Sequence, residues 1–229
     1  IPLFACAVND IGYCENKIFI VLKEHVVNFN IHKRIKEYYP DAKVLIINEV
    51  TQGQACTCEK AIIEAKLNLD KPIVISAIDN GVSYDGNRYY DLIEDNNDVI
   101  VWSFRNNQTA RIKPNSYSWL EVDKDNNLIK EHSKSYPFQD SPNNNHAIIG
   151  TMFFRKTKYF MDSLNYNYKN DIKTNGEFYV DDLLNNCIKN GLKVKVFESN
   201  HYCCWGSSRD IKVYKYWADY FNKKFGLKG

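Results

Sequence analysis

The segment TQGQACTCEKA (51–61) places a glycine and several hydroxyl side chains where a helix is predicted to begin. Gly53 allows a backbone path that other residues rarely take. The helix after it would point free N–H groups and the positive end of its dipole at whatever lies there. Thr51, Gln52, Gly53 and Gln54 are therefore candidates for holding a polar or anionic ligand. A turn glycine beside an N-cap threonine is the alternative.

The cysteines do not have the spacing of a metal site. Cys56 and Cys58 are two residues apart, so on a helix their side chains point about 200° from one another. Zinc-binding pairs usually have two residues between them and a second pair or histidines to match. His201, Cys203 and Cys204 are a denser cluster, but strand alternation sends adjacent cysteines to opposite faces. We expect the seven cysteines to be reduced and structural.

A carboxylate follows the apolar segment PIVISAI (72–78). If this segment is a strand, Asp79 lies at its end, and Asn80 and Gly81 complete a turn that exposes the side chain. Ordinary turn chemistry explains an Asp-Asn-Gly sequence equally well. Asp79 is thus a candidate ligand-binding residue, and its role depends on the fold around it.

The first half of the chain alternates strands and helices. Short β-branched and aromatic runs predict strands, and apolar residues at helical spacing predict helices. The predicted strands are 17–22, 43–47 and 72–76, and the predicted helices are 24–39, a helix from about residue 54, and 86–94. Almost continuously apolar strands of this kind are typical of a parallel sheet covered by helices on both faces.

The second half is more mixed. Alternation on either side of Asp125, Asn126 and Asn127 predicts a hairpin over 117–132. Further strands are predicted at 98–104, 146–154 and 193–199, helices at 176–190 and from about Asp210, and a loop at 139–145. There is no internal repeat and no long linker, so we predict a single domain over residues 1–229.

The predicted fold class is α/β, a Rossmann-like three-layer α/β/α arrangement with a mostly parallel central sheet. Ligands in such sheets bind beyond the carboxyl ends of the strands. The TQGQ turn and Asp79 both follow predicted strands at that end.

Composition excludes several classes of partner. The chain has 30 basic and 28 acidic residues, so no net field favours nucleic acid or an anionic membrane. The longest apolar stretch, Ile1 to Val8, is far shorter than the roughly 20 residues of a membrane span, and it lacks the flanks of a signal peptide. The sequence therefore predicts a cytoplasmic protein.

Four segments, taken in order, resemble one enzyme family. TQGQACT, PIVISAIDN, HAIIGTMFF and NGEFYVDDLLN look like the nucleotidyltransferase family of sugar-1-phosphate pyrophosphorylases, which has a GT-A-like fold. They are most similar to the branch associated with capsule and surface-polysaccharide loci. The resemblance implies that an acceptor phosphate oxygen attacks the α-phosphorus of a nucleoside triphosphate and that pyrophosphate leaves, with Mg²⁺ as the cofactor.

The same resemblance assigns the nucleotide side of the site. It makes Thr51, Gln52, Gly53 and Gln54 the loop that lies against the base and ribose. It also makes Asp79 the carboxylate that holds the catalytic magnesium.

On the acceptor side, Gly150 and Glu177 match positions that line the pocket of the phosphorylated acceptor. The lysine of the family's Glu-Lys pair falls on His132, with Lys134 close by, and either residue would neutralise the acceptor phosphate. The plainer explanations are a helix N-terminal acid for Glu177 and a solvated surface charge for His132 and Lys134.

The chain departs from the family pattern in two places. The family's glycine-rich G-x-G-x-R loop and the Pro-Lys segment after it are absent, and no two of the ten glycines are two residues apart. Because IPL resembles the end of the first strand and FACAVNDI the helix after the loop, we predict that a disordered or deleted segment belongs between Leu3 and Phe4. Cys204 stands where the family usually has a second metal-binding carboxylate.

Two other functions fit parts of the sequence. A glycosyltransferase of similar fold would also use an aspartate after an apolar strand, but such enzymes usually carry D-x-D, and Gly81 stands at the third position. A non-catalytic regulatory homologue would explain both the missing glycine-rich loop and Cys204. The base, the acceptor and the oligomeric state are not specified by the sequence, and a homo-oligomer is compatible with it.

Overall fold

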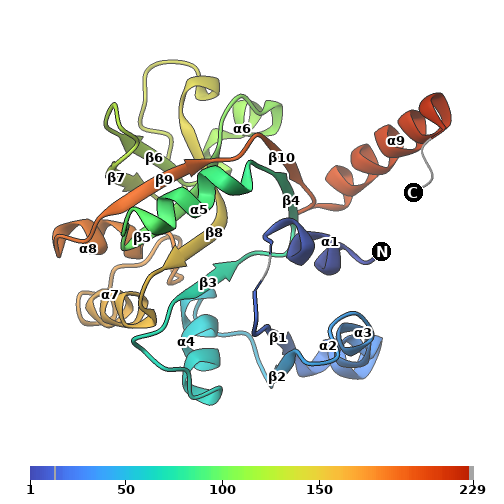
Figure 1. The fold of residues 1–229 in the computed structure, drawn as a ribbon, viewed down its shortest axis with the longest axis horizontal. Coiled ribbons are helices and arrows are strands. Elements are labelled where there is room, and N and C mark those ends of the chain that lie inside the picture. The colour runs from blue at the N-terminus through green and yellow to red at the C-terminus, as the bar shows by residue number, and fades with distance from the viewer. Residues whose placement is uncertain (13, 227–229) are drawn as a thin grey trace.

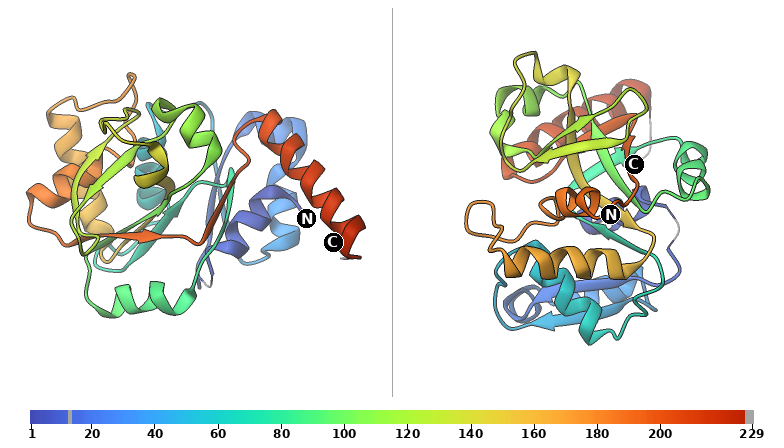
Figure 2. Two further views of the ribbon diagram at one scale, coloured as in Figure 1. Left: turned by 90° about the horizontal axis from the view of Figure 1, so that it is seen from above. Right: turned by 90° about the vertical axis from the view of Figure 1, so that its left-hand side faces the viewer.

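The structure of the chain is a computed structural model that describes residues 1–12 and 14–226. Figures 1 and 2 show a main sheet with helices on both faces and a smaller N-terminal unit beside it. Residue 13 and residues 227–229 of the predicted domain lie outside the described residues. None of the described helices is long and apolar enough to cross a membrane.

The N-terminal unit is built on a two-stranded sheet. β1 (Ile18–Leu22) pairs in parallel with β2 (Lys43–Ile47). A small core forms under these strands, with Phe4, Phe19 and Ile35 among its buried members. The helices of this unit are α1 (Leu3–Asp10), α2 (Lys23–Phe29) and α3 (Ile31–Tyr38).

The main sheet has six strands, and β8 lies at its centre. β8 (His146–Phe154) pairs along one edge with β5 (Val99–Phe104). Along its other edge β8 pairs first with β6 (Trp119–Val122) and then with β3 (Ile73–Ser76). The remaining strands are β7 (Leu128–His132) and β9 (Val194–Glu198).

This sheet is mixed, which corrects the expectation of a mostly parallel one. β8 runs antiparallel to β3, β5 and β6, β7 runs antiparallel to β6, and β5 pairs in parallel with β9. Thus β3, β5, β6 and β9 point one way, against β7 and β8. The alternation of buried residues is the same in either direction, so strand polarity could not be read from the pattern.

Helices cover both faces of the main sheet and divide its core in two. On one face, the core around Met152 and Phe154 is closed by α4 (Gln54–Glu64), α7 (Thr157–Lys169) and α8 (Leu183–Lys189). On the other face, Trp102, Ile149 and Phe153 pack with α5 (Gly86–Glu94) and α6 (Gln108–Ile112). The two short 3₁₀ helices are η1 (Pro114–Ser116) and η2 (Pro142–Asn144).

Two predicted helices are different in the structure. The helix predicted over 24–39 is two helices, because Asn30 adopts a left-handed conformation with φ of 50° between α2 and α3. The helix predicted over 176–190 begins only at Leu183. Asn175 and Gly176 both have positive φ and join Thr174 to Glu177 as a tight β-type turn.

A second small sheet links the middle of the chain to its end. β4 (Asn80–Ser83) pairs antiparallel with β10 (His201–Cys204), which places Asn80 opposite Cys204. Asn80 and Gly81 therefore start a strand and do not form the predicted turn. After β10, α9 (Ser208–Phe225) leaves the body of the molecule, as Figure 1 shows.

Candidate functional site

The TQGQ loop is held together by its hydroxyl groups. The Thr51 hydroxyl donates to the Gly53 carbonyl at 2.7 Å and lies 2.6 Å from the Thr57 hydroxyl. At the start of α4 the amide of Ala55 bonds to Phe178 and that of Thr57 to Gly53. The amide of Gln54 donates to no group among the described residues, so it is available to a ligand.

Gly53 is needed for close packing against another segment of the chain. Its φ of 134° and ψ of 170° suit glycine almost alone. A Cβ atom there would lie 2.5 Å from the carbonyl oxygen and 2.6 Å from the amide nitrogen of Phe178. Two backbone hydrogen bonds clamp the contact, from Phe178 to the Gln52 carbonyl at 2.9 Å and from Ala55 to the Phe178 carbonyl at 3.0 Å. The loop and the segment that contains Glu177 are therefore neighbours.

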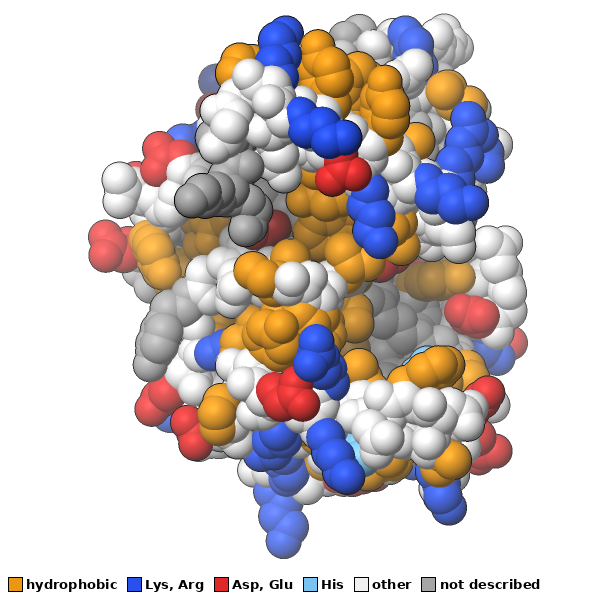
Figure 3. All heavy atoms as spheres, turned by 90° about the vertical axis from the view of Figure 1, so that its right-hand side faces the viewer, with side chains coloured by type: hydrophobic (Ala, Val, Ile, Leu, Met, Phe, Trp, Pro, Cys, Tyr) orange, Lys and Arg blue, Asp and Glu red, His pale blue; other side chains and the backbone are white. Residues whose placement is uncertain are grey.

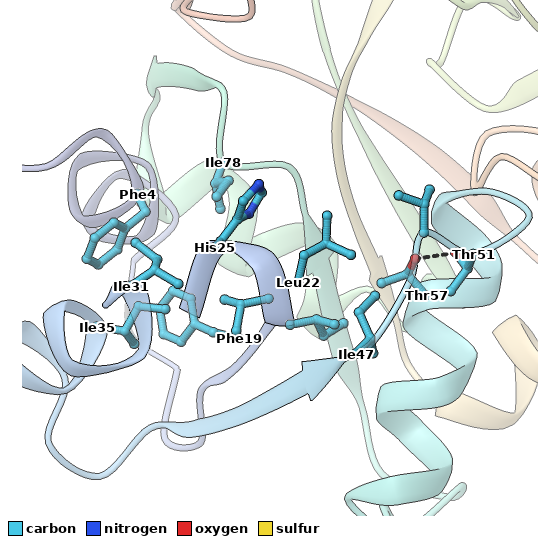
Figure 4. A pocket seen from close by; sticks show the side chains of 13 residues that line it. Phe4, Phe19, Leu22, His25, Ile31, Ile35, Ile47, Thr51, Thr57 and Ile78 are labelled. Atoms are coloured by element: carbon cyan, nitrogen blue, oxygen red, sulfur yellow. Dashed lines mark hydrogen bonds between the residues drawn. The ribbon is translucent and has the colours of Figure 1, made fainter. Parts of the chain in front are cut away.

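An apolar groove of about 440 Å³ runs along this loop. Figure 4 shows Thr51 and Thr57 at one end, Phe19 and Leu22 of β1 along its floor, and Ile78 on the far side. Ile78 precedes Asp79, so the groove joins the TQGQ loop to the end of β3. The sequence predicts both segments at one rim of a sheet, and in the structure they border one groove.

Asp79 is exposed, as expected, and its carboxylate has few partners. The amide of Asn80 reaches it at only 3.5 Å, and that amide also donates to the Ile149 carbonyl at 3.2 Å. The backbone carbonyl of Asp79 accepts from Trp205 at 2.7 Å, and a Cβ atom on Gly206 would lie 3.1 Å from its Oδ2. The segment with Cys204 is thus brought beside Asp79.

The Asp79 carboxylate suits a hard divalent cation. Mg²⁺ is commonly held by one or two carboxylates together with water and substrate phosphates, and the Asp79 side chain is exposed with one long contact to Asn80. Within residues 1–12 and 14–226, no group of three or more His, Cys, Asp and Glu side chains is arranged to hold a metal by itself. A site here therefore needs phosphate oxygens to complete it.

The cysteines have no arrangement for metal binding in the described chain. All seven are free thiols, and the Cys204 thiol points to the Asp210 carboxylate at 3.7 Å. Cys58 packs against the main core, and burial raises the pKa of its thiol to about 12. It would stay protonated at neutral pH and be a poor metal ligand.

Gly150 marks the point where β8 changes partner, which we call the β8 fork. β6 pairs with Ala147 and His146 on one side of this point, and β3 pairs with residues from Thr151 onward. Gly150 has φ of 91°, and its carbonyl accepts from the Ala77 amide at 3.0 Å. β8 therefore exchanges β6 for β3 as its partner around Gly150, and Asp79 lies two residues beyond Ala77 on the β3 side.

A buried acidic cluster lies across the fork, and the sequence analysis missed it. Glu131, Asp181 and Asp182 are 3%, 7% and 7% exposed. The Ser133 hydroxyl contacts both Glu131, at 2.6 Å, and Asp182. Burial, with the charge of Asp181, raises the pKa of Glu131 well above its usual value, and burial also raises the pKa of Asp181. The one signal in the sequence is the pair Asp181-Asp182 between Val180 and Leu183. Acidic residues that adjoin apolar residues on both sides can be buried, and buried acids are uncommon.

Lys134 lies between this cluster and the Glu177 segment. Its φ is 48°, its ammonium nitrogen is 5.3 Å from the Tyr179 ring centroid, and its amide is 3.4 Å from the Ser118 hydroxyl. The positive charge lowers the pKa of Asp181 against the effect of burial. Tyr179 lies between Lys134 and Glu177, because its ring contacts the Lys134 ammonium and its pKa is raised by burial and by the nearby Glu177 carboxylate.

His132 lies elsewhere. It is next to Glu131 on β7, so its side chain points to the opposite face of the strand. Its ring is 3.5 Å from the Glu121 carboxylate and 5.9 Å from the Phe138 ring centroid. Of the two cations suggested for the acceptor phosphate, Lys134 is the one that the fold places beside the fork.

Comparisons with known proteins give structural neighbours only. No family model matches the sequence, and no curated protein is significantly similar to it. The fold is similar to that of a nucleoside-diphosphate-sugar pyrophosphorylase from Vibrio cholerae RC9, with a TM-score of 0.71 and 15% identity over 93% of this chain and 86% of that chain. It is also similar to HddC from Yersinia pseudotuberculosis, with a TM-score of 0.58 and 17% identity over 93% and 81% of the two chains. The expected nucleotidyltransferase-like α/β architecture is thereby confirmed as a fold.

Proposed function

We propose that this chain is a nucleotidyltransferase that moves a nucleotidyl group from a nucleoside triphosphate to a phosphorylated sugar, polyol or similar small acceptor. One observation carries the proposal. The β8 fork ties the segments of Asp79 and Lys134 to neighbouring residues of β8: the Ala77 amide, two residues before the exposed Asp79, donates to the Gly150 carbonyl, and Ser118 joins the Ile148 amide to the Lys134 amide. A metal-bound triphosphate and an anionic acceptor need a carboxylate and a cation at one site.

In this reaction an acceptor phosphate oxygen forms a bond to the α-phosphorus of the triphosphate. The bond from the α-phosphorus to the bridging oxygen breaks, and pyrophosphate leaves with the electron pair. The protein contributes positioning and charge neutralisation, with no covalent intermediate on the enzyme. A bound Mg²⁺ would supply charge neutralisation at the α-phosphate.

We assign the tasks of the residues accordingly. Asp79 would hold Mg²⁺, and Thr51, Gln52, Gly53 and Gln54 would lie along the base and ribose. On the other side of the fork, Lys134 would neutralise the acceptor phosphate, and Gly150 and Glu177 would border the acceptor. His132 would contact the acceptor only at the periphery of the site, because its ring lies against the Glu121 carboxylate.

The predicted extra segment between Leu3 and Phe4 is retained as a proposal. These two residues are consecutive in α1. β1 pairs only with β2 and β3 only with β8 among the described strands, and the apolar groove is lined by β1 residues and by Ile78, two residues after β3. An additional strand with a phosphate-binding loop would fit there. A mass of 26.8 kDa for the intact natural protein would exclude such a segment.

We also propose that the product serves capsule or surface-polysaccharide synthesis and that the protein acts in the cytoplasm. The decisive experiment is a pyrophosphate-release screen of CTP, UTP, GTP and dTTP against a panel of sugar and polyol phosphates with Mg²⁺. Release with one pair is expected. Sugar transfer from a nucleotide-sugar without pyrophosphate would identify a glycosyltransferase, and no binding of any triphosphate by calorimetry would identify a non-catalytic homologue.

Asp79→Asn tests the metal assignment. The substitution keeps the shape and removes the charge, so turnover should fall by at least 100-fold, about 2.7 kcal/mol of transition-state stabilisation. Asp162→Asn is the matched control, because Asp162 is an exposed acid on α7 whose side chain makes no hydrogen bond to any residue that the structure describes. Activity of Asp79→Asn within a few-fold of the control would refute the assignment.

A further inference from the structure

α9 is a long helix that lies mostly outside the body of the protein. It has 18 residues, and none of them is buried. Ser207 caps its start by accepting from the Asp210 amide at 3.2 Å, and Tyr214 contacts the Trp205 ring with centroids 5.5 Å apart. Beyond this first part the helix extends away from the other elements, as Figures 1 and 2 show.

The two faces of α9 differ sharply. At about 100° per residue, six of its nine polar side chains form a strip roughly 100° wide, and the other three, Arg209, Asp210 and Lys224, lie within the broad hydrophobic face that fills the remainder. The strip consists of Ser208, Lys212, Lys215, Asp219, Asn222 and Lys223. The exposed hydrophobic residues are Val213, Tyr214, Tyr216, Trp217, Tyr220, Phe221 and Phe225, each between 41% and 65% exposed.

The aromatic residues of this face are already ordered against one another. The rings of Trp217 and Phe221 are stacked with centroids 5.9 Å apart, as are those of Phe221 and Phe225. In Figure 3 hydrophobic side chains lie among Lys and Arg side chains over the upper part of the molecule, where α9 ends. An aromatic face of this extent in water marks an interaction surface.

Charges at the middle of the hydrophobic face have a symmetric arrangement. Asp210 and Lys224 lie seven residues before and seven residues after Trp217. Seven residues are two turns, about 10.5 Å, so the three side chains share one line along the helix. Val213 and Tyr220 alternate with them, which gives the spacing of a coiled-coil seam.

We propose that α9 pairs antiparallel with α9 of a second copy of this chain, centred on Trp217. In that arrangement Asp210 faces Lys224 of the partner subunit, and the contact occurs twice because the interface is symmetric. A parallel pair would set Asp210 against the partner's Asp210 and Lys224 against the partner's Lys224. The opposite charges at equal distances from Trp217 thus make the surface complementary to itself only in the antiparallel direction.

Both side chains keep capacity for these contacts. Asp210 is half-buried and uses Oδ2 to accept from the Ser207 hydroxyl at 2.5 Å and from the Cys204 thiol at 3.7 Å, whereas Oδ1 accepts no hydrogen bond from any described residue. The Lys224 ammonium is 3.4 Å from the Tyr220 hydroxyl and 5.6 Å from the Phe225 ring centroid, at the surface of the same face. A lipid surface is a poorer occupant, because it would have to accept the Asp210 carboxylate within the apolar face.

Sedimentation velocity on the full chain tests the proposal. The wild type should be a dimer in the micromolar range. Lys224→Glu should raise the dissociation constant at least tenfold, because each of two attractive contacts becomes repulsive. Lys223→Glu carries the same charge change on the polar strip and should leave the constant within about twofold.

Two further outcomes decide the matter. Trp217→Ala should also produce monomer, with the helical circular dichroism of the wild type as evidence of folding. A wild type that stays monomeric at about 100 µM, or a dimer that Lys224→Glu and Lys223→Glu weaken equally, would overturn the proposal. Monomer that binds anionic vesicles would overturn it as well and would identify a membrane surface as the occupant.

Discussion

Gly53→Ala is the substitution that most directly tests how the TQGQ loop is built. Its added methyl group has no room, since its carbon would lie 2.5 Å and 2.6 Å from two backbone atoms of Phe178. Backbone atoms cannot rotate away as the end of a flexible side chain can. The loop and the segment at Phe178 must therefore separate.

The cost can be worked out from the structure. The backbone of Gly53, at φ of 134° and ψ of 170°, is strained for any residue with a Cβ atom, which costs about 1–3 kcal/mol. Separation also breaks the two hydrogen bonds that Phe178 makes with Gln52 and Ala55, at about 1 kcal/mol each. We expect the free energy of unfolding to fall by about 3–5 kcal/mol in total.

Urea denaturation of Gly53→Ala and Gly191→Ala makes the comparison. Gly191 also has positive φ, 76°, but a Cβ atom there meets nothing within 4 Å. Its substitution should cost only about 1–2 kcal/mol of conformational strain. If the two variants lose the same stability, the contact with Phe178 is not tight and the reasoning fails. The sequence suggested that Gly53 makes room for a nucleoside, but its free side already faces Phe178, so weaker nucleotide binding by a Gly53 variant would reflect loss of the loop.

Two further substitutions test the buried groups. Glu131→Gln removes a carboxyl group whose pKa burial raises in the folded protein. The stabilising contribution of that group is fully present below its unfolded pKa of about 4.3 and is lost as the pH rises through the folded value. In urea titrations the variant should therefore gain stability relative to wild type between pH 5 and pH 8, and an equal difference at both pH values would contradict this. Cys58→Ala should lower the free energy of unfolding by roughly 1 kcal/mol, because the side chain packs on the main core, and an unchanged denaturation midpoint would show that it does not.

Elements with strong local patterns were predictable from the sequence. β8 is a run of apolar residues and has the predicted bounds 146–154. α5 begins after Asp85, which caps its N-terminus, and has the predicted bounds 86–94. The hairpin of β6 and β7 also formed where alternation and a polar turn placed it. In each case the residues that determine the element lie within it.

Elements that depend on distant partners were not predictable. β4 contains Asn80 and Gly81, which locally favour a turn, and it is a strand because β10 pairs with it from more than a hundred residues away. Residues 177–182 were predicted as part of a helix, but the backbone of Phe178 is hydrogen-bonded to the TQGQ loop and the helix begins only at Leu183. No strand or helix had been predicted for α7, where Asn and Tyr side chains interrupt the apolar spacing.

The candidate site shows the same division. The sequence identified Asp79, Gly150 and the TQGQ loop as single positions, but their relation comes from the change of partner along β8 and from Phe178. Glu131 and Asp182 became visible only when β7 and α8 were placed together, since they meet through Ser133. Charge that is buried by tertiary packing leaves little trace in a local pattern.

Residues 177–182 connect the two sides of the proposed site. Phe178 is hydrogen-bonded to the TQGQ loop, Tyr179 lies under the Lys134 ammonium, and Asp182 is tied through Ser133 to Glu131. The spacing between the TQGQ loop and Lys134, which we propose for the nucleotide and the acceptor phosphate, is therefore fixed by one short segment with buried anchors on both sides. An in-line displacement depends on holding two substrates at a set distance and angle. Residues 177–179 lie outside any helix and residues 180–182 turn into α8, so this one stretch of chain contacts both the TQGQ loop and the residues around Lys134.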